Sequence, residues 1–189
     1  MTNQWFSPAS TLLTVTDIQE KLAAAMPAKH VQGNVTRAAK LIKAANKLAI
    51  PTVATEQYSD RLGPTLPVIK TELSEFDPIN KLSFSCCEEI AYLDAIEDSQ
   101  ATTIALCGLE THVSVLQTAL ALQEKSKNVI VVEDACCSRY SNDHSCAIDL
   151  LAKTGIHIVT FELLLFAWLK RAGTDEFKSL SHLTLERDY

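Results

Sequence analysis

The stretch from Thr102 to Leu122 constrains the fold more than any other part of this sequence. It begins as an apolar run of strand length, reaches Gly108, and continues directly into residues with helical spacing. A buried strand that turns straight into a helix brings free backbone N–H groups and the positive end of the helix dipole to one point. Anions, including the oxyanion of an acyl-transfer intermediate, are stabilised at such a point. We therefore expect an active site, if the chain has one, at this turn, where the side chain is Ser114.

Strands and helices are expected to alternate on both sides of this stretch. Apolar, β-branched runs predict strands at residues 11–16, 52–55, 80–84, 128–134 and 156–160, and helical spacing predicts helices at 34–46, 87–96, 142–154 and 162–171. Asn34 is the expected N-cap of the first helix, after a polar, Ala-rich connection that runs to Gly33. No strong element is expected between Gly63 and Asn80. Near-continuous Val, Ile and Leu strands that alternate with helices are typical of a parallel sheet covered on both faces.

Polar side chains fall where these strands end. Asp17 follows the first strand, the run Glu56-Gln57-Tyr58 follows the second, and Lys81 lies in the short third strand. Ligands of open parallel sheets bind beyond the carboxyl ends of the strands, near the point where the strand order reverses. We therefore expect Asp17, Lys81 and Ser114 to converge on one cavity.

The size and charge of the chain restrict the classes of protein to consider. Its 189 residues suit a single domain, 1–189, with a core of about 10–171 and a polar C-terminal tail at 172–189. A net charge of −6 argues against a nucleic-acid surface, which normally needs a basic face. The longest apolar run, 161–169, contains Glu162 and is far shorter than the ~18 residues of a membrane span, so no membrane association is expected.

The cysteines and the N-terminus indicate an intracellular protein. The six cysteines include two neighbouring pairs, Cys86-Cys87 and Cys136-Cys137, which make a poor disulfide framework, and no Cys-x-x-Cys motif occurs. The first residues show neither a secretory signal nor a standard transit peptide. We expect reduced thiols and a cytoplasmic location, with a mitochondrial one left open.

Several motifs together resemble one known family. They are Thr16-Asp17-Ile18-Gln19, Glu56-Gln57-Tyr58, Lys81-Leu82-Ser83-Phe84-Ser85, Gly108-Leu109-Glu110-Thr111-His112-Val113-Ser114-Val115 and Asp134-Ala135-Cys136-Cys137-Ser138-Arg139. In this order they resemble the isochorismatase-like cysteine hydrolase superfamily over roughly residues 10 to 170. The resemblance is closest to the isochorismatase-domain-containing proteins and the mitochondrial-associated group named as ribonucleases. It implies a three-layer α-β-α fold with a mostly parallel six-stranded sheet, no cofactor, and a small amide or related carbonyl compound as substrate.

The resemblance also implies roles for individual residues. Asp17 corresponds to the general base of the family, Lys81 to its orienting cation and Ser114 to its nucleophile. A cis peptide bond of the family corresponds to the bond between Leu109 and Glu110, where it aims the N–H groups of Glu110 and Ser114 at the oxyanion. The remaining residues that the resemblance places in the oxyanion hole and substrate pocket are Thr111, Val113, Gln19, Tyr58 and Phe84.

Ser114 departs from the family, whose nucleophile is a cysteine. A thiol with a pKa near ~8.5 is readily deprotonated beside a cation and a helix N-terminus, whereas a serine hydroxyl normally needs His or Lys as its base. Lys81 beside Asp17 should stay protonated, and His112 lies two positions from Ser114, where helix side chains do not face each other. Ser114 is therefore a weak nucleophile, the mark of a pseudoenzyme, or an engineered replacement of cysteine. A purely structural role as a helix-capping serine is the fourth alternative.

Three functions follow from these residues. The first is metal-independent hydrolysis of a small amide-type substrate, with activity that is weak or lost because of Ser114. The second is a catalytically silent member that serves as an oligomeric scaffold or ligand-binding protein, and the third is the ribonuclease activity for which similar proteins are named. Nicotinamide-hydrolysing relatives hold a metal near the second strand, but residues 55–65 contain no histidine, so we expect no metal site. The helix at 163–169 is apolar nearly all round, which favours a homo-oligomer.

Overall fold

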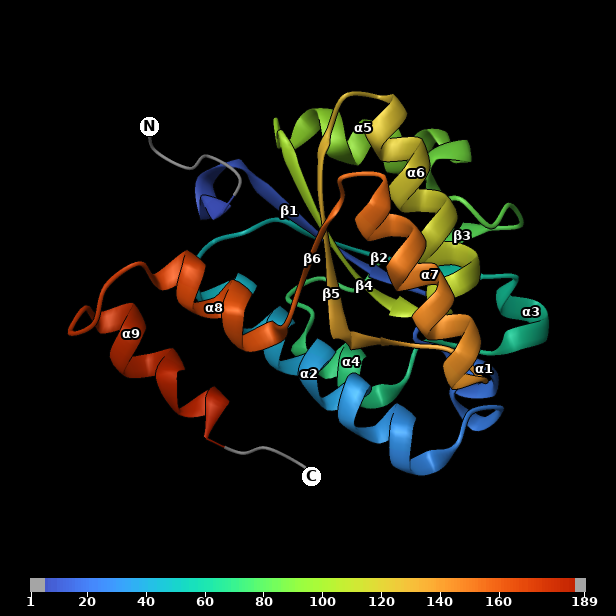
Figure 1. Cartoon of the computed structure of the whole chain (residues 1–189), viewed down its shortest axis with the longest axis horizontal. Coiled ribbons are helices and arrows are strands. Elements are labelled where there is room, and N and C mark those ends of the chain that lie inside the picture. Colours follow the sequence, from blue (N-terminus) through green and yellow to red (C-terminus); the bar gives the residue numbers. More distant parts are fainter. Residues whose placement is uncertain (1–5, 186–189) are drawn as a thin grey trace.

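A parallel sheet forms the centre of the molecule, as Figure 1 shows for the computed structural model, which describes residues 6–185. Its strands are β1 (Thr11–Thr16), β2 (Thr52–Gln57), β3 (Ile79–Lys81), β4 (Thr103–Leu109), β5 (Asn128–Cys137) and β6 (His157–Val159). They lie in the order β3-β2-β1-β4-β5-β6, and every neighbouring pair is parallel. The predicted six-stranded parallel sheet of an α/β fold is confirmed.

Helices cover both faces of this sheet. They are α1 (Glu20–Ala24), α2 (Ala28–Lys47), α3 (Ser59–Leu62), α4 (Pro67–Glu72), α5 (Ile90–Asp98), α6 (Leu116–Glu124), α7 (Ser141–Lys153), α8 (Phe161–Leu169) and α9 (Asp175–Leu180). Short 3₁₀ turns occupy Pro8–Ser10, Cys86–Glu88 and Ser181–Thr184, and a π-helical turn occupies Thr111–Val115. In Figure 1, α2, α4 and α8 lie on one side of the sheet, and α5, α6 and α7 lie on the other.

The strand order reverses between β1 and β4. From β1 the chain builds outward through β2 to β3, and from β4 it builds the other way through β5 to β6. A crevice forms at the carboxyl ends of the two strands that flank such a reversal. Asp17 directly follows β1, and the turn that carries Ser114 directly follows β4. The topology therefore places both residues at the position where doubly wound sheets bind ligands.

Gly108 allows these two strands to lie close together at their ends. It pairs with Thr16 of β1 and has φ of 132°. A Cβ atom added at Gly108 would lie 2.0 Å from the backbone oxygen of Thr16, closer than any real contact. Only glycine fits at this position, and its fit sets the distance between the residue after β1 and the turn after β4.

Two expected loop regions contain helices. Helix α2 begins at Ala28, with Pro27 at its N-cap, so Gly33 and Asn34 lie inside the helix and the predicted N-cap at Asn34 is wrong. The Asn34 side chain instead donates hydrogen bonds to the backbone oxygens of Asp134 and Cys136 in β5, at 2.9 and 2.6 Å. Between Gly63 and Asn80, where no strong element was expected, α4 packs against α2 and buries Ile69. Tertiary packing outweighed the weak local signals at both places.

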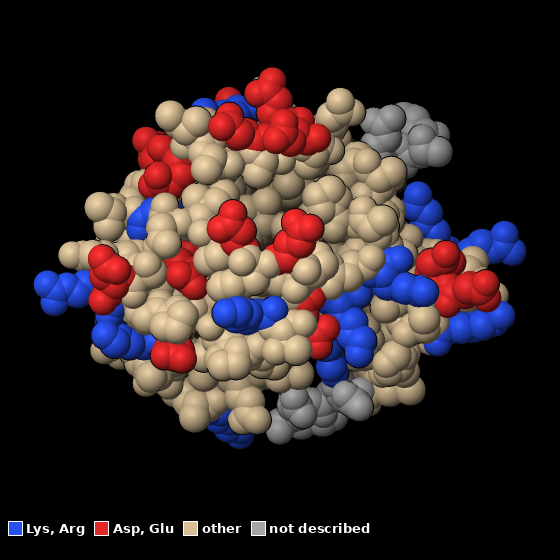
Figure 2. Space-filling view, turned by 180° about the vertical axis from the view of Figure 1, so that it is seen from behind, with Lys and Arg blue, Asp and Glu red and all other residues tan. Residues whose placement is uncertain are grey.

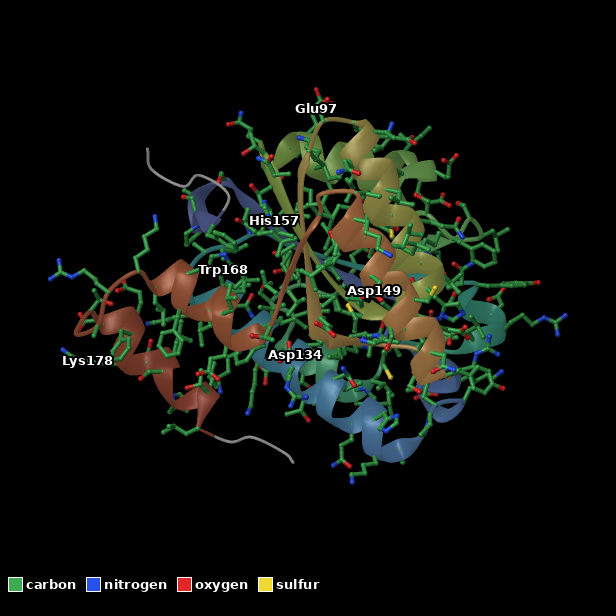
Figure 3. All side chains as sticks on the ribbon, viewed as in Figure 1. Glu97, Asp134, Asp149, His157, Trp168 and Lys178 are labelled. Atoms are coloured by element: carbon green, nitrogen blue, oxygen red, sulfur yellow. The ribbon has the colours of Figure 1, made fainter. Side chains whose placement is uncertain are left out.

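Helix α8 is covered mostly by its own chain. Its buried side chains are Phe161, Leu164, Leu165, Trp168 and Leu169, and Trp168 lies on the side of α8 that faces the rest of the molecule (Figure 3). The polar tail also contributes buried side chains, because α9 and the following turn bury Leu180 and Leu183. Phe177 of α9 lies 6.4 Å from Phe166, measured between ring centroids. No helix within residues 6–185 is both long and apolar enough to cross a membrane.

Candidate active site

A buried ion pair joins the ends of β1 and β3. Asp17 has a left-handed backbone with φ of 52°. Its Oδ2 accepts a hydrogen bond from Lys81 Nζ at 2.7 Å, and its Oδ1 accepts one from Thr55 Oγ1 at 2.7 Å. The side chains of Asp17 and Lys81 have 0% of their surface exposed. The carboxylate is thus held from both sides, and its charge is compensated by Lys81.

Lys81 donates to a ring of acceptors. Its Nζ lies 2.6 Å from Gln57 Oε1, 3.1 Å from the backbone oxygen of Phe84 and 3.3 Å from that of Ser83. Carbonyl and carboxylate oxygens can only accept, and an ammonium group can only donate. This arrangement suits Lys81 as a fixed cation and not as a general base.

Ser114 completes the cluster on the turn between β4 and α6. It lies in the π-helical turn Thr111–Val115, retains only 3% of its surface exposed, and places Oγ 3.3 Å from Lys81 Nζ. The N–H groups of Val113 and Val115 donate to the Glu110 backbone oxygen, which shapes this turn. The structure therefore brings Asp17, Lys81 and Ser114 together, with Lys81 between the other two. No direct hydrogen bond joins Asp17 to Ser114 in the described part of the chain.

Gln57 is a further residue of this cluster, which the sequence placed at the end of a strand but without a role. It pairs with Lys81 in the register between β2 and β3. Besides accepting from Lys81, it donates from Nε2 to the Leu82 backbone oxygen at 2.8 Å. Thr55 lies two residues earlier, so both side chains leave β2 on the same face. The alternating polar residues Thr55 and Gln57 at the end of a strand were the sequence signal for this site. Their contact with Lys81 could be recognised only from the register between β2 and β3.

Gln19, expected in the substrate pocket, is instead engaged with the backbone. Its Oε1 accepts from the N–H of Gln57 at 2.8 Å, and its Nε2 donates to the backbone oxygens of Gln57 and Gly63 at 3.0 and 2.6 Å. It is fully buried. Gln19 therefore links the loop after α3 to the end of β2, and it holds Gln57 where Gln57 meets Lys81.

The side chains of Glu110 and Thr111 point toward the start of α7. The peptide bond between Leu109 and Glu110 is cis. The Glu110 carboxylate accepts from the backbone N–H of Arg139 at 2.9 Å and from its Nε at 3.1 Å, and Thr111 Oγ1 lies 2.8 Å from His144 Nδ1. Because both side chains are engaged with these partners, only the backbone N–H groups of the two residues are available to an oxyanion. Val113, on the same turn, is partly exposed.

Two buried thiols, Cys86 and Cys107, are not suited to replace Ser114. Cys86 Sγ lies 3.8 Å from Thr55 Oγ1, and burial together with the nearby charge of Asp17 raises the pKa of this thiol. Burial raises the pKa of Cys107 to about 12. A thiol that stays protonated at neutral pH is a poor nucleophile. His112, the other neighbour of interest, directs Nδ1 at Ser138 Oγ, 3.0 Å away.

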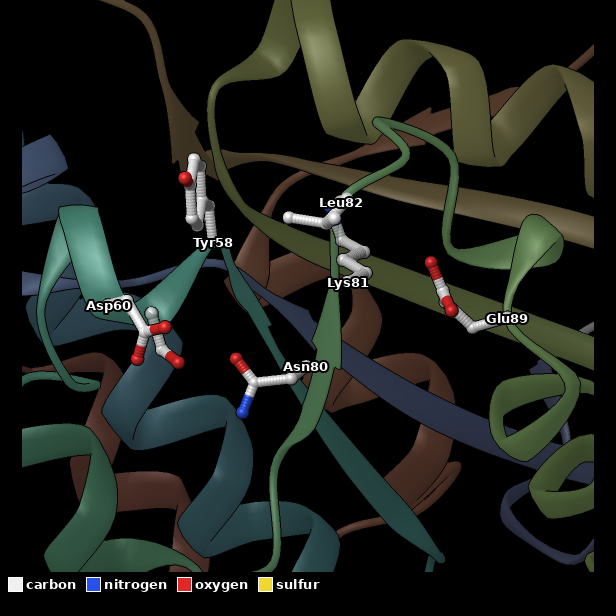
Figure 4. A pocket seen from close by; sticks show the side chains of 7 residues that line it. Tyr58, Asp60, Asn80, Lys81, Leu82 and Glu89 are labelled. Carbon is white, nitrogen blue, oxygen red and sulfur yellow. The ribbon is translucent and has the colours of Figure 1, made fainter.

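A pocket of about 530 Å³ has Lys81, but neither Asp17 nor Ser114, in its lining. Its lining residues are Tyr58, Ser59, Asp60, Asn80, Lys81, Leu82 and Glu89, as Figure 4 shows. Tyr58, expected at the pocket, does line it, whereas Phe84 is exposed beyond the lining and contributes its backbone oxygen to Lys81. Across residues 6–185, no group of three or more His, Cys, Asp or Glu side chains could hold a metal ion.

Fold and site together define an α/β protein with a buried Asp-Lys-Ser cluster at the reversal of a parallel sheet. The isochorismatase domain family matches residues 11–162, and the chain belongs to this isochorismatase-like hydrolase family.

Three relatives illustrate how far the similarity extends. Isochorismatase domain-containing protein 2 of Bos taurus is 36% identical over 95% of this chain and 85% of its own length. The secreted isochorismatase effector Isc1 of Phytophthora sojae is 36% identical over 95% of this chain and 86% of its own length. The structure of MAR1 ribonuclease from Caenorhabditis elegans superposes with a TM-score of 0.89 at 35% identity and covers 95% of this chain and 92% of that one.

Proposed function

We propose that the protein hydrolyses a small amide or a related carbonyl compound through a covalent acyl intermediate on Ser114, without a metal. One observation carries the proposal. A single buried ammonium group, Lys81 Nζ, contacts both a carboxylate, Asp17, and a hydroxyl, Ser114, at 2.7 and 3.3 Å. A base, a cation and a nucleophile within one water-poor site are the parts that acyl transfer needs.

The proposed reaction has two steps. Ser114 Oγ attacks the carbonyl carbon and loses its proton to Asp17, and the N–H groups of Glu110 and Ser114 stabilise the oxyanion. The bond to the leaving group then breaks, and the leaving group takes the proton from Asp17. In the second step a water molecule gives a proton to Asp17 and attacks the acyl carbon, and the acid departs as the proton returns to Ser114 Oγ.

Proton transfer is the demanding part of this reaction. A serine hydroxyl is far less acidic than a thiol, and a carboxylate is a weak base for it. Ser114 also has to move toward Asp17, or to reach it through one water molecule, because apo geometries often tighten only when substrate binds. We therefore expect turnover well below that of an otherwise identical cysteine enzyme.

The test is a panel of small amides and activated esters, assayed with the natural chain and with Ser114→Cys and Ser114→Ala. Turnover should be low for serine, higher for cysteine and lost for alanine, and intact-protein mass spectrometry should detect an acyl group on residue 114 of the first two. Equal rates for the serine and alanine proteins, with no adduct on Ser114→Cys, would exclude the proposal.

A catalytically silent, ligand-binding protein is the second candidate. It is favoured by the hydrogen bonding of Ser114, whose contact in the cluster is with an ammonium donor, Lys81, and not with a base. The same experiment separates the two functions. A silent protein would bind small molecules in the pocket, but it would form no adduct and would give no turnover in any of the three forms.

RNA cleavage is suggested by the names of similar solved structures, among them the MAR1 ribonuclease from Caenorhabditis elegans. The surface of this chain gives it little support. The net charge is −6, and on the face in Figure 2 the Lys and Arg side chains lie beside Asp and Glu rather than forming one basic band. We therefore rank RNA below small molecules, and single-stranded RNA belongs in the substrate panel as a comparison.

An intracellular location, in the cytoplasm before the mitochondrion, is part of this proposal. It is supported by the cysteines, all six of which are free thiols. The secreted character of the Phytophthora sojae effector is a property of that protein. Subcellular fractionation of the source cells is the direct test.

A further inference from the structure

The pocket beside Lys81 is lined by negatively charged side chains and by no basic side chain that is free to pair with them. Two carboxylates, Asp60 and Glu89, line it, and Lys81 is its one basic lining residue. The ammonium group of Lys81 is already paired with Asp17, and its side chain has no exposed surface. A ligand in the pocket therefore meets two carboxylates and no uncompensated cation in the lining.

Neither carboxylate is neutralised by a basic side chain of the described residues. Glu89 Oε1 accepts a hydrogen bond from the Ser83 hydroxyl at 2.6 Å, which fixes the carboxylate without removing its charge. Within residues 6–185, neither Asp60 nor Glu89 forms an ion pair with a Lys, Arg or His side chain. In Figure 4 the two acidic residues lie on opposite sides of β3, so that a ligand over this strand would lie between them.

The rest of the lining is suited to an organic cation. Tyr58 leaves 46% of its surface exposed, and its position is fixed because its N–H donates to the Lys81 backbone oxygen at 2.9 Å. The face of a tyrosine ring attracts ammonium groups. Leu82 adds exposed aliphatic surface to the pocket, and a volume of about 530 Å³ suits a small molecule.

We propose that this pocket binds the cationic end of the substrate, a small amide or ester that carries an ammonium group, and that it rejects substrates whose corresponding end is a carboxylate. The proposal rests on the proposed function for the statement that the ligand is a substrate. Lys81 lies in the pocket lining, and its Nζ is within hydrogen-bond distance of Ser114, so the pocket and the candidate nucleophile share this residue. A carboxylate in the same place would face two like charges, a form of selection against the wrong ligand.

Three inert probes of one shape test the binding directly. Choline carries a trimethylammonium group, 3,3-dimethylbutan-1-ol replaces that group by a neutral tert-butyl group, and 3,3-dimethylbutanoate combines the tert-butyl group with a carboxylate. Titration calorimetry should give choline an affinity about tenfold higher than the neutral alcohol and should give the carboxylate the weakest binding. The advantage of choline should shrink as ionic strength rises, because Asp60 is exposed. The proposal is overturned if the carboxylate binds as tightly as choline.

Two substitutions test whether the preference for choline arises in this pocket. Asp60→Asn and Glu89→Gln should each reduce the advantage of choline over the neutral alcohol by about threefold, and the double variant should abolish it. Asp149→Asn is the matched control, since it removes one charge from an exposed position on α7, outside the pocket lining (Figure 3). An undiminished advantage in the double variant, with a thermal unfolding midpoint like that of the natural chain, would refute the assignment.

These measurements do not depend on turnover. Choline preference without hydrolysis of any ester would leave the binding proposal standing and would contradict the proposed function. Hydrolysis with equal kcat/KM for cationic and anionic esters would support the proposed function and would refute the preference. A larger fall in kcat/KM for cationic esters than for neutral esters in the double variant would support both.

Discussion

Lys81 Nζ lies 2.7 Å from Asp17 Oδ2, although the two residues end strands that are separated in the sheet by β2. The pair is completed by groups of the intervening strand, since Thr55 bonds Asp17 and Gln57 bonds Lys81. Burying two charges costs free energy that their attraction only partly returns, so such a pair is a weak source of stability. Its value in this protein is positional, because it places a fixed cation against Ser114.

We predict that Lys81→Met lowers the free energy of unfolding by about 3–5 kcal/mol, because it leaves the buried carboxylate of Asp17 without a partner. The double variant Asp17→Asn/Lys81→Met should recover part of this loss. Urea denaturation at neutral pH measures both values. Lys153→Met, at an exposed position, is the control and should change the value by less than about 0.5 kcal/mol. Additive losses in the double variant would contradict a coupled pair.

We predict that the thiol of Ser114→Cys has a pKa below the usual ~8.5, since it would lie beside the Lys81 ammonium at the start of a helix. The rate of alkylation by iodoacetamide as a function of pH reports this value. In the Ser114→Cys background, Gln57→Leu should shift the rate profile without abolishing alkylation, because it removes one acceptor that holds Lys81 in place. A pKa at or above that of free cysteine would show that the cluster does not activate a nucleophile.

We predict that Gly108→Ala prevents folding or lowers the thermal midpoint sharply, because the new Cβ would lie 2.0 Å from the Thr16 backbone oxygen. Gly155→Ala is a close control. Gly155 also has a positive φ, of 88°, but no atom lies within 4 Å of its added Cβ, so only backbone strain of about 1–2 kcal/mol is expected. Similar midpoints for the two variants would show that β1 and β4 can separate without cost.

The sequence predicts much of this fold because the central strands are buried on both faces. All six residues of β1 are buried, and β4 is buried along its whole length, so their apolar composition follows from their place in the sheet. The start of helix α2 does not follow from burial of this kind. Its first two turns contain Gly33 and few apolar side chains, and the helix is stabilised there by contacts that Asn34 makes with a strand 100 residues away.

The site was partly predictable for a related reason. Asp17 and Ser114 occupy the two strand ends that flank the chain reversal, and strand ends can be located from apolar periodicity. The position of Gln57 depends on the register between β2 and β3, and that of Gln19 depends on a loop that folds back to Gly63. Local sequence determines neither the register nor the path of the loop, so the contacts by which Gln57 and Gln19 position Lys81 appeared only with the structure.

We predict that stability falls as the pH drops below about 6.5, in part through His144. Burial lowers the pKa of His144 in the folded protein, and the nearby Glu133 carboxylate, 3.9 Å from Nε2, opposes this effect only partly. As the pH falls, His144 therefore binds a proton first in the unfolded chain, near its ordinary pKa of ~6.5. The free energy of unfolding decreases from that pH down to the pKa of His144 in the folded protein. His144→Asn keeps a group that can bond Thr111 and should flatten the dependence of the thermal midpoint on pH between about 7 and 5. His182→Asn is the control, and an unchanged slope in His144→Asn would contradict the assignment.

We predict that the protein is a homo-oligomer in which α8 contributes to the contact. The chain itself buries most of this helix, but Leu163 and Phe166 keep 49% and 41% of their surfaces exposed, even with Phe177 packed against Phe166. Apolar side chains that remain exposed together on one helix favour contact with another subunit.

Light scattering at micromolar concentration should give a mass that is a multiple of 20.8 kDa. The double variant Leu163→Ser/Phe166→Ser should shift this mass toward the monomer, whereas Leu185→Ser, at an exposed leucine outside α8, should not. A homogeneous species of 20.8 kDa from the natural chain would show that α9 and the turn at Ser181–Thr184 provide all the cover that α8 requires.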